Sequence, residues 1–324
     1  MEIKYHFVDE ILKNKIIEDR RMFHQYPELG WVEYWTSWVI AERLKELGFE
    51  VFVGKDICDA ASRMGLPEDE VFKQSQELAL KKGVPESAME IMCGGYTGVI
   101  GVLRGKKGAK KTALRFDIDA LCINESVTEK NSSYRSEQQN IMHACGHDGH
   151  IAVGLGVASV LSQHQDQLET DVYLIFQPAE EGCRGAKAIV SRGWLDEIDT
   201  FYSGHIGIGY RELGKIGACT HGFMASTKLD MIFHGVAAHA ANAPEEGRNA
   251  LLAAAEFTVK AYDFYESCSK DVRMNVGRMK AGSGRNIIAD EAVLEIETRG
   301  VDSVSNLLLK ERLCCLAEKI SEKH

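Results

Sequence analysis

No stretch of the 324 residues is apolar over the roughly 18–20 positions that a membrane span needs. The N-terminal residues, Met-Glu-Ile-Lys-Tyr-His, lack the basic segment and apolar core of a secretory signal peptide. Positive charge is also scarce, because 38 lysines and arginines stand against 48 aspartates and glutamates, a net charge of −10. Such an acidic chain is not expected to bind nucleic acid nonspecifically, although a local arginine cluster can still bind a small anion.

The cysteines lack the even number and regular spacing of a disulfide framework. There are nine of them, and we expect reduced thiols in a cytoplasmic protein. Hydrophobic residues make up 45% of the chain and charged residues 27%, which is typical of globular proteins and excludes a largely disordered one. The length leaves room for two domains.

Apolar patterns predict an α/β domain in the first part of the chain. Helical spacing is found over 7–20, 35–47, 69–82, 149–163 and about 185–191, and strand-like runs over 50–53, 97–103, 112–116, 171–176 and 200–204. Strands that alternate with helices are typical of a sheet between helical layers. We interpret the polar segment 54–93 as an insertion outside the core.

A second domain is predicted after residue 221. The order there is strand (226–233), helix (248–265), two strands (272–280 and 292–299) and helix (303–323). This order is typical of an α+β sandwich with helices on one face of a sheet. We therefore divide the chain into the domains 1–221 and 222–324.

Residues 143–150, His-Ala-Cys-Gly-His-Asp-Gly-His, gather three histidines, one cysteine and one aspartate. Thiolate and imidazole are ligands of Zn²⁺ and related metals, and a carboxylate extends the choice towards Mn²⁺. Cys145 and His147 lie near a predicted helix start, where the helix dipole and a bound cation would both favour the thiolate. The alternative is a buried cysteine beside histidines that cap the helix.

Other candidate ligands follow the ends of predicted strands. Glu180 and Glu181 can divide the roles of metal ligand and general base, although acidic residues are also common at helix N-termini. His205 is either a further ligand or a buried structural histidine. Asp119, together with Asp117, is a candidate to orient the ligand histidines, and a solvated turn is the alternative.

Four motifs make the chain similar to the M20 metallopeptidase superfamily, in its amidohydrolase branch. They are residues 21–30 (RMFHQYPELG), 117–121 (DIDAL), 143–148 (HACGHD) and 178–182 (PAEEG). The resemblance implies an α/β, zinc-peptidase-like catalytic domain with a mixed sheet between helices. It also implies an inserted α+β, ferredoxin-like domain that acts as a lid and in dimerisation.

The resemblance further implies a site with two divalent metal ions, Mn²⁺ or Zn²⁺. Their ligands would be Cys145, His147, Glu181 and His205. Glu180 would be the general base that takes a proton from the attacking water.

The resemblance assigns substrate contacts to the second domain. His239 would reach into the site of its partner in a dimer, where it would stabilise the oxyanion of the tetrahedral intermediate. Asn286 and Arg299 would hold the substrate carboxylate, and Arg285 is a further candidate.

The implied activity is hydrolysis of the amide bond of an N-acyl or N-aroyl amino acid, first of all p-aminobenzoyl-glutamate. Hippurate, indole-acetyl-amino acids and N-acetyl-diaminopimelate are alternative substrates. The lid would form a homodimer or a hetero-oligomer with a B-type subunit. Family members are expected to continue for roughly another hundred residues, including a last metal-binding histidine and the last lid strand. A partner-dependent chain with impaired catalysis is therefore an alternative.

Overall fold

The computed structural model describes residues 7–105, 110–207, 212, 214–218 and 221–324. Contacts divide the chain into two compact units, Met1–Arg211 and Glu212–His324. The division thus falls before residue 222, where the sequence predicted a domain boundary. None of the helices in the described ranges is long and apolar enough to cross a membrane.

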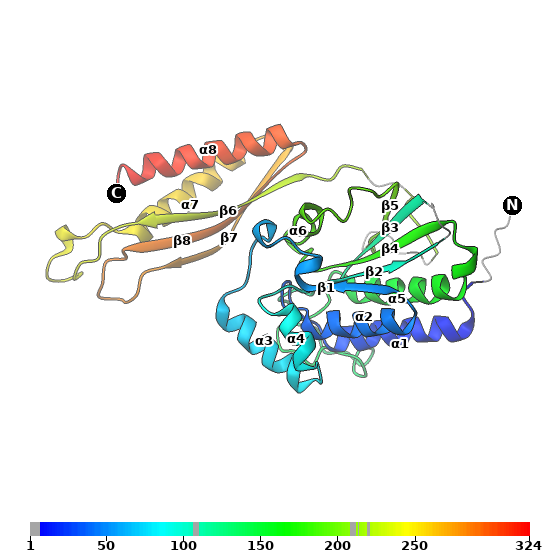
Figure 1. Cartoon of the computed structure of the whole chain (residues 1–324). Helices are drawn as coiled ribbons and strands as arrows, with labels where there is room; N and C mark the ends of the chain where they lie inside the picture. The colour runs from blue at the N-terminus through cyan, green and yellow to red at the C-terminus, as the bar shows by residue number, and fades with distance from the viewer. Residues whose placement is uncertain (1–6, 106–109, 208–211, 213, 219–220) are drawn as a thin grey trace. The chain divides into compact units, whose positions relative to one another are not determined.

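The first unit is built on a five-stranded mixed sheet. Its strands are β1 (Glu50–Val53), β2 (Val99–Leu103), β3 (Lys110–Asp117), β4 (Thr170–Gln177) and β5 (Thr200–Ser203). They lie in the order β1-β2-β4-β3-β5. β2 pairs antiparallel with β1 and β4, whereas β3 pairs parallel with β4 and β5. This mixed sheet between helices confirms the predicted α/β class (Figure 1).

Helices cover both faces of this sheet. They are α1 (Glu10–Gln25), α2 (Tyr34–Glu46), α3 (Asp69–Lys81), α4 (Glu86–Met92), α5 (His147–Gln163) and α6 (Ala186–Ser191). Figure 1 shows α1, α2 and α5 on one face and α6 on the other. Val172 and Leu174 of β4 join the core beneath α2 and α5, whereas Tyr173 joins the core beneath α6. Successive side chains of a strand point to opposite faces, so β4 serves both cores.

The parallel strands bring their carboxyl ends to one edge of the sheet. Asp117 at the end of β3 is paired with Gln177 at the end of β4, and Arg115 of β3 with Ser203 of β5. The segments that follow these three strands carry most of the candidate ligands. An open α/β sheet characteristically builds its site at such an edge.

The segment 54–93 belongs to the core, so its interpretation as an insertion outside the core was wrong. Ile57 is buried in the core beneath α6, and Ala79, Met89 and Met92 are buried in the core shared with α2. The sequence also did not predict α4, which carries Met89 and Met92. Polar residues dominate the composition of this segment, but they occupy the outer side of helices whose few apolar residues point inward.

The second unit is a three-stranded antiparallel sheet with two helices on one face (Figure 1). Its strands β6 (Ala225–His234), β7 (Val272–Ala281) and β8 (Glu291–Gly300) lie in the order β6-β8-β7. The helices are α7 (Ala250–Glu266) and α8 (Ser303–Ser321). Asn249 and Asp302 begin them as N-caps, since their side chains accept backbone N–H groups of the first turn. This is the α+β arrangement that the sequence predicted.

The core position of α4 can be tested with Met92→Ala. Loss of a buried methionine side chain is expected to lower the free energy of unfolding by about 2–5 kcal/mol, because Met92 is 2% exposed. Leu80→Ala is the matched control, since Leu80 on the neighbouring α3 is 40% exposed. Urea denaturation measures both variants, and equal losses would contradict the core assignment.

Candidate metal centre

The candidate ligands reach one edge of the sheet from strand ends and from a helix start. β4 is followed by Glu180 and Glu181, β5 by His205, and α5 begins at His147. Gly146 precedes α5 with a φ of +86°, a left-handed conformation that favours glycine. This turn allows the residues on both sides of Gly146 to contribute to the same group of ligands.

The first group of potential ligands is Cys145, His147 and Glu181, whose donor atoms lie within 4.8 Å of one another. Nδ1 of His147 lies 2.8 Å from the backbone carbonyl oxygen of Asp119, so Nδ1 donates a hydrogen bond to that oxygen and Nε2 is the nitrogen available to a metal ion. Nε2 of His147 and Oε1 of Glu181 are buried without a hydrogen-bond partner among the described residues. Buried polar atoms are normally paired, and two such unpartnered ligand atoms together suit a bound cation.

The second group of potential ligands is Asp117, His147, His150 and His205. Nε2 of His205 also lies 3.5 Å from the sulfur of Cys145, which links the two groups. Nε2 of His150 accepts a hydrogen bond from the backbone N–H of Ile206 at 3.1 Å. Nδ1 of His150 lies 3.5 Å from Oδ2 of Asp117. Protein groups thus contact both nitrogens of His150. Its contact with the N–H of Ile206 holds the segment that carries His205 against α5.

All four residues predicted as ligands lie in these two groups. Asp117 and His150 join them, although the sequence offered Asp117 only as an orienting residue and did not single out His150. The available signal was spacing, because His150 follows His147 by three positions and therefore lies on the same side of α5. Whether each residue binds metal stays a prediction.

The pKa values of two potential ligands show that their surroundings favour positive charge. Burial, and then the carboxylates of Glu181 and Glu180, raise the pKa of the Cys145 thiol to about 12. Burial acts to lower the pKa of His147, but contacts with Asp119 outweigh it and raise this pKa to about 9. Both shifts reflect carboxylates that favour nearby positive charge. A divalent cation would supply that charge and displace both protons, so the residue set fits a metal.

Asp119 holds the two adjacent glutamates. Its buried carboxylate accepts the backbone N–H groups of Glu180 and Glu181, each at 3.0 Å. Oε2 of Glu180 lies 3.8 Å from Nε2 of His147. Burial, and next the charge of Asp117, raise the pKa of Glu180. A carboxylate with a raised pKa beside a potential ligand is suited to accept and return a proton.

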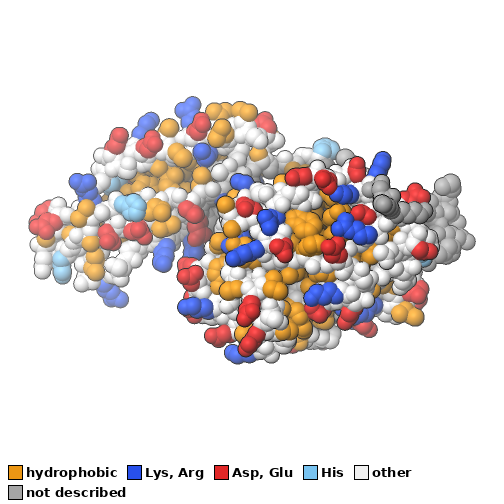
Figure 2. Space-filling view, in the orientation of Figure 1, with side chains coloured by type: hydrophobic (Ala, Val, Ile, Leu, Met, Phe, Trp, Pro, Cys, Tyr) orange, Lys and Arg blue, Asp and Glu red, His pale blue; other side chains and the backbone are white. Residues whose placement is uncertain are grey.

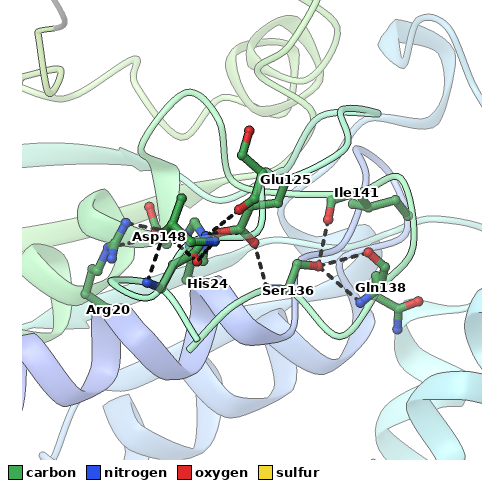
Figure 3. Close-up of polar contacts among 10 residues, drawn as sticks. Arg20, His24, Glu125, Ser136, Gln138, Ile141 and Asp148 are labelled. Carbon is green, nitrogen blue, oxygen red and sulfur yellow. Dashed lines mark hydrogen bonds and ion pairs between the residues drawn. The ribbon is translucent and has the colours of Figure 1, made fainter. Parts of the chain in front are cut away.

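A buried ionic network anchors the start of α5 to α1 (Figure 3). Oδ2 of Asp148 lies 2.8 Å from Nδ1 of His24 and 2.8 Å from Nε of Arg20. Nε2 of His24 lies 3.1 Å from Oε1 of Glu125. His24 therefore has a carboxylate at each ring nitrogen, and both nitrogens donate. Burial acts to lower the pKa of His24, but these hydrogen bonds prevail and raise it.

The same network holds the loop that leads to the histidine cluster. Glu125 accepts the backbone N–H of Ser136 at 2.8 Å. The Ser136 hydroxyl lies within hydrogen-bond distance of the carbonyl oxygens of Gln138 and Ile141 (Figure 3). The sequence did not predict these contacts, because His24 and Asp148 are 124 positions apart.

In the second unit, the structure brings His239 and Asn286 together. The backbone N–H of Ala240 donates to the carbonyl oxygen of Asn286 at 3.0 Å. Nδ1 of His239 accepts the backbone N–H groups of Ala241 and Asn242 at 3.2 and 3.3 Å. The proton of neutral His239 therefore lies on Nε2, which leaves that atom as a donor.

Arg299 does not lie with these residues. It stands near the end of β8, whereas Asn286 precedes the start of that strand at Glu291. The eight steps from Glu291 to Arg299 span about 26 Å at the rise of an extended strand. Arg299 is paired with Glu297 at 3.0 Å. Arg285 is exposed beside Asn286. Figure 2 shows that basic, acidic and apolar side chains are interspersed over the face in view.

The chain is similar to known proteins of one family. The family described as Peptidase family M20/M25/M40 matches residues 113–311. The indole-3-acetyl-aspartic acid hydrolase of Enterobacter agglomerans is 43% identical over 90% of this chain and 68% of its own length. The A-type subunit of the p-aminobenzoyl-glutamate hydrolase of Escherichia coli (strain K12) is 41% identical over 96% of this chain and 72% of its own length.

Solved structures show the same fold. The aminobenzoyl-glutamate utilization protein from Klebsiella pneumoniae has a TM-score of 0.77 and 37% identity, over 97% of this chain and 75% of that one. A Bacillus subtilis protein described as a dinuclear metal binding peptidase from the M20 family has a TM-score of 0.61 and 26% identity, over 97% of this chain and 72% of that one.

The ionic network makes a prediction about pH. The folded-state pKa of His24 is raised above the usual 6.5, so its contribution is complete below about pH 6.5 and is lost as the pH rises through the raised value. His24→Gln is expected to lower the free energy of unfolding by about 3 kcal/mol at pH 6. The difference from wild type should shrink at alkaline pH.

Denaturant titrations at several pH values measure this effect, with His234→Gln as the control because the His234 side chain is 73% exposed. The control is expected to stay within about 0.5 kcal/mol of wild type. A His24→Gln deficit that grows with pH would refute the charged form of His24.

Proposed function

The chain belongs to the peptidase family M20/M25/M40, and on this premise we propose that it is a metal-dependent amidohydrolase of N-acyl amino acids. One observation carries the proposal. Two overlapping groups of potential ligands, which share His147, lie beside a glutamate with a raised pKa. A site of that composition is suited to hydrolysis by water rather than to redox or storage chemistry.

We propose that two divalent ions, Mn²⁺ or Zn²⁺, are held by Cys145, His147, Glu181 and His205. The similar protein from Bacillus subtilis, a dinuclear metal binding peptidase, supports this number. When bound, such ions polarise a carbonyl group and lower the pKa of a water molecule. Asp119 keeps His147 in the tautomer that presents Nε2 to the ions.

The chemical step is assigned to Glu180. Its carboxylate accepts a proton from the water that attacks the amide carbonyl carbon, and it returns this proton to the departing amine nitrogen as the C–N bond breaks. The raised pKa of Glu180 suits both transfers. The Nε2–H of His239 is proposed to stabilise the oxyanion of the tetrahedral intermediate, which forms after the first proton transfer and breaks down with the second.

The proposed substrate is p-aminobenzoyl-glutamate, which would give p-aminobenzoate and glutamate. The names of the two relatives at 41% and 43% identity support an aromatic acyl group joined to an acidic amino acid. Arg299 and Asn286 are proposed to bind the substrate carboxylate, and Arg285 is a weaker candidate. Indole-acetyl-amino acids, hippurate and N-acetyl-diaminopimelate remain alternatives, because they share the same amide chemistry.

We further propose that the second unit is a lid through which two copies of the chain assemble, or through which this chain binds a B-type subunit. His239 and Arg299 lie on opposite ends of one sheet, with β8 between them. A small substrate cannot contact both residues of one copy at that separation. A site that takes its arginine from one copy and its histidine from another resolves this difficulty. A cytoplasmic location, where thiols stay reduced, is part of the same proposal.

The activity is tested by release of p-aminobenzoate from p-aminobenzoyl-glutamate with Mn²⁺ or Zn²⁺ added. Glu180→Gln is expected to lower kcat by about 10²–10⁴-fold, because the proton acceptor is lost. Its metal affinity should stay near the wild-type value, as Glu180 is not a proposed ligand. A metal-loaded protein that releases no p-aminobenzoate would contradict the substrate, and preference for an acetylated donor would favour an alternative.

The shared site is tested by mixing two inactive variants, Glu180→Gln and His239→Ala. In a mixed dimer, one site combines an intact Glu180 with an intact His239, so part of the activity should return. Native mass spectrometry verifies that mixed dimers form. Mixed dimers without recovered activity would show that His239 does not act on the partner's site.

A further inference from the structure

A half-buried turn carries the two glutamates of the candidate metal centre. It consists of residues 178–181 and follows β4 directly. Three consecutive backbone N–H groups of this turn donate to buried carboxyl groups. Asp119 accepts those of Glu180 and Glu181 at 3.0 Å. Oε1 of Glu33 accepts that of Ala179 at 2.8 Å.

Glu33 comes from a distant part of the chain and has no exposed surface. It precedes α2 as its N-cap residue, but its side chain does not cap that helix. Instead, its second carboxyl oxygen contacts the hydroxyl of Thr97 at 2.5 Å. Both oxygens of Glu33 are thus engaged, one by the turn and one by the segment that leads into β2.

The turn has a backbone conformation that needs such support. Ala179 has a φ of +47°, which is unusual for a residue other than glycine. Neighbouring glycines leave room for the turn: a Cβ at Gly98 would lie 2.5 Å from Pro178, and one at Gly30 would lie 3.0 Å from Ala179. A strained conformation persists when the surrounding contacts determine it, and such conformations cluster at functional sites.

We infer that Glu33 is a positioning residue, which together with Asp119 sets the orientation of the Glu180 and Glu181 carboxylates by holding the backbone that carries them. The inference rests on the proposed function, since it treats Glu181 as a metal ligand and Glu180 as the base. Glu33 touches neither group directly. It acts through the N–H of Ala179 and the turn that follows.

The contacts of Glu33 suggest a suitable replacement. Burial, and then the charge of Asp119, raise the pKa of Glu33, which lowers the cost of replacing it with an uncharged side chain. One carboxyl oxygen of Glu33 accepts the N–H of Ala179, and the other accepts the hydroxyl of Thr97. Glutamine keeps an oxygen that can accept the N–H of Ala179, and its NH₂ group can donate to the hydroxyl oxygen of Thr97.

The test compares Zn²⁺ affinity in Glu33→Leu, Glu33→Gln and wild type, by competition with a chromophoric chelator. Glu33→Leu keeps a buried side chain but offers no acceptor, and is expected to weaken Zn²⁺ binding by about 10–100-fold. Glu33→Gln should recover most of that loss. Thermal unfolding of the metal-free proteins is measured alongside, so that a change in affinity can be separated from a change in stability.

Glu28→Leu is the matched control. Glu28 lies five positions before Glu33, is half-buried, and accepts the N–H groups of Trp35 and Thr36 rather than those of the turn. The Glu28→Leu protein should lose stability while its Zn²⁺ affinity stays at the wild-type value. An equal loss of affinity in Glu28→Leu would reduce the role of Glu33 to general packing and overturn the inference.

A folded Glu33→Leu protein with wild-type affinity would also overturn the inference. If Glu33→Leu does not fold, Glu33→Asp decides, because the shorter side chain withdraws its carboxyl from Ala179 and should weaken Zn²⁺ binding. Wild-type Zn²⁺ affinity in the Glu33→Asp protein would contradict the inference. Zn²⁺ affinity is measured without substrate, so a protein that hydrolyses no amide but shows the predicted affinities would refute the proposed function and retain the role of Glu33.

Discussion

The candidate centre depends on the parallel pairing of β3 with β4 and β5. Parallel neighbours must end at the same edge, so the residues after each strand meet although they lie far apart in the chain. Asp119 follows β3, which lies between β4 and β5, and can therefore contact the segments on both sides. It accepts the N–H groups of Glu180 and Glu181, and its backbone carbonyl sets the proton of His147. An antiparallel β3 would send these groups to opposite edges.

The second constraint is electrostatic. Carboxylates gathered at one buried edge are costly unless they are protonated, hydrogen-bonded or matched by cations. The chain uses all three responses in one region. Glu33 tends to keep its proton, Asp119 is bonded to backbone N–H groups, and Asp148 is matched by His24 and Arg20. Nε2 of His147 and Oε1 of Glu181 have no hydrogen-bond partner within the part of the chain that the structure describes, and a metal ion bound there would complete the balance.

The second unit places its candidate residues at opposite ends of one sheet. Its antiparallel sheet places His239 and Asn286 beyond one end of β8 and Arg299 near the other. The length of β8 therefore keeps Arg299 apart from the other two residues. The backbone N–H groups of Ala241 and Asn242 occupy Nδ1 of His239 and leave Nε2 as the donor of the neutral ring.

Much of this could be predicted from the sequence, because local pattern determines local structure. Period-2 and period-3.6 spacing identified most strands and helices, and the residue types at 143–150, 180–181 and 205 identified a candidate centre. The mistaken interpretation of 54–93 shows the limit, since Met89 and Met92 become core only when α4 packs near α2. The contacts of Glu33 with Ala179, and of His24 with Asp148 and Glu125, join positions more than a hundred residues apart. By itself the sequence determined which chemical groups are available and where strands end. Only the tertiary structure decided which of those groups meet, because that depends on strand order and pairing direction, and no local pattern encodes either.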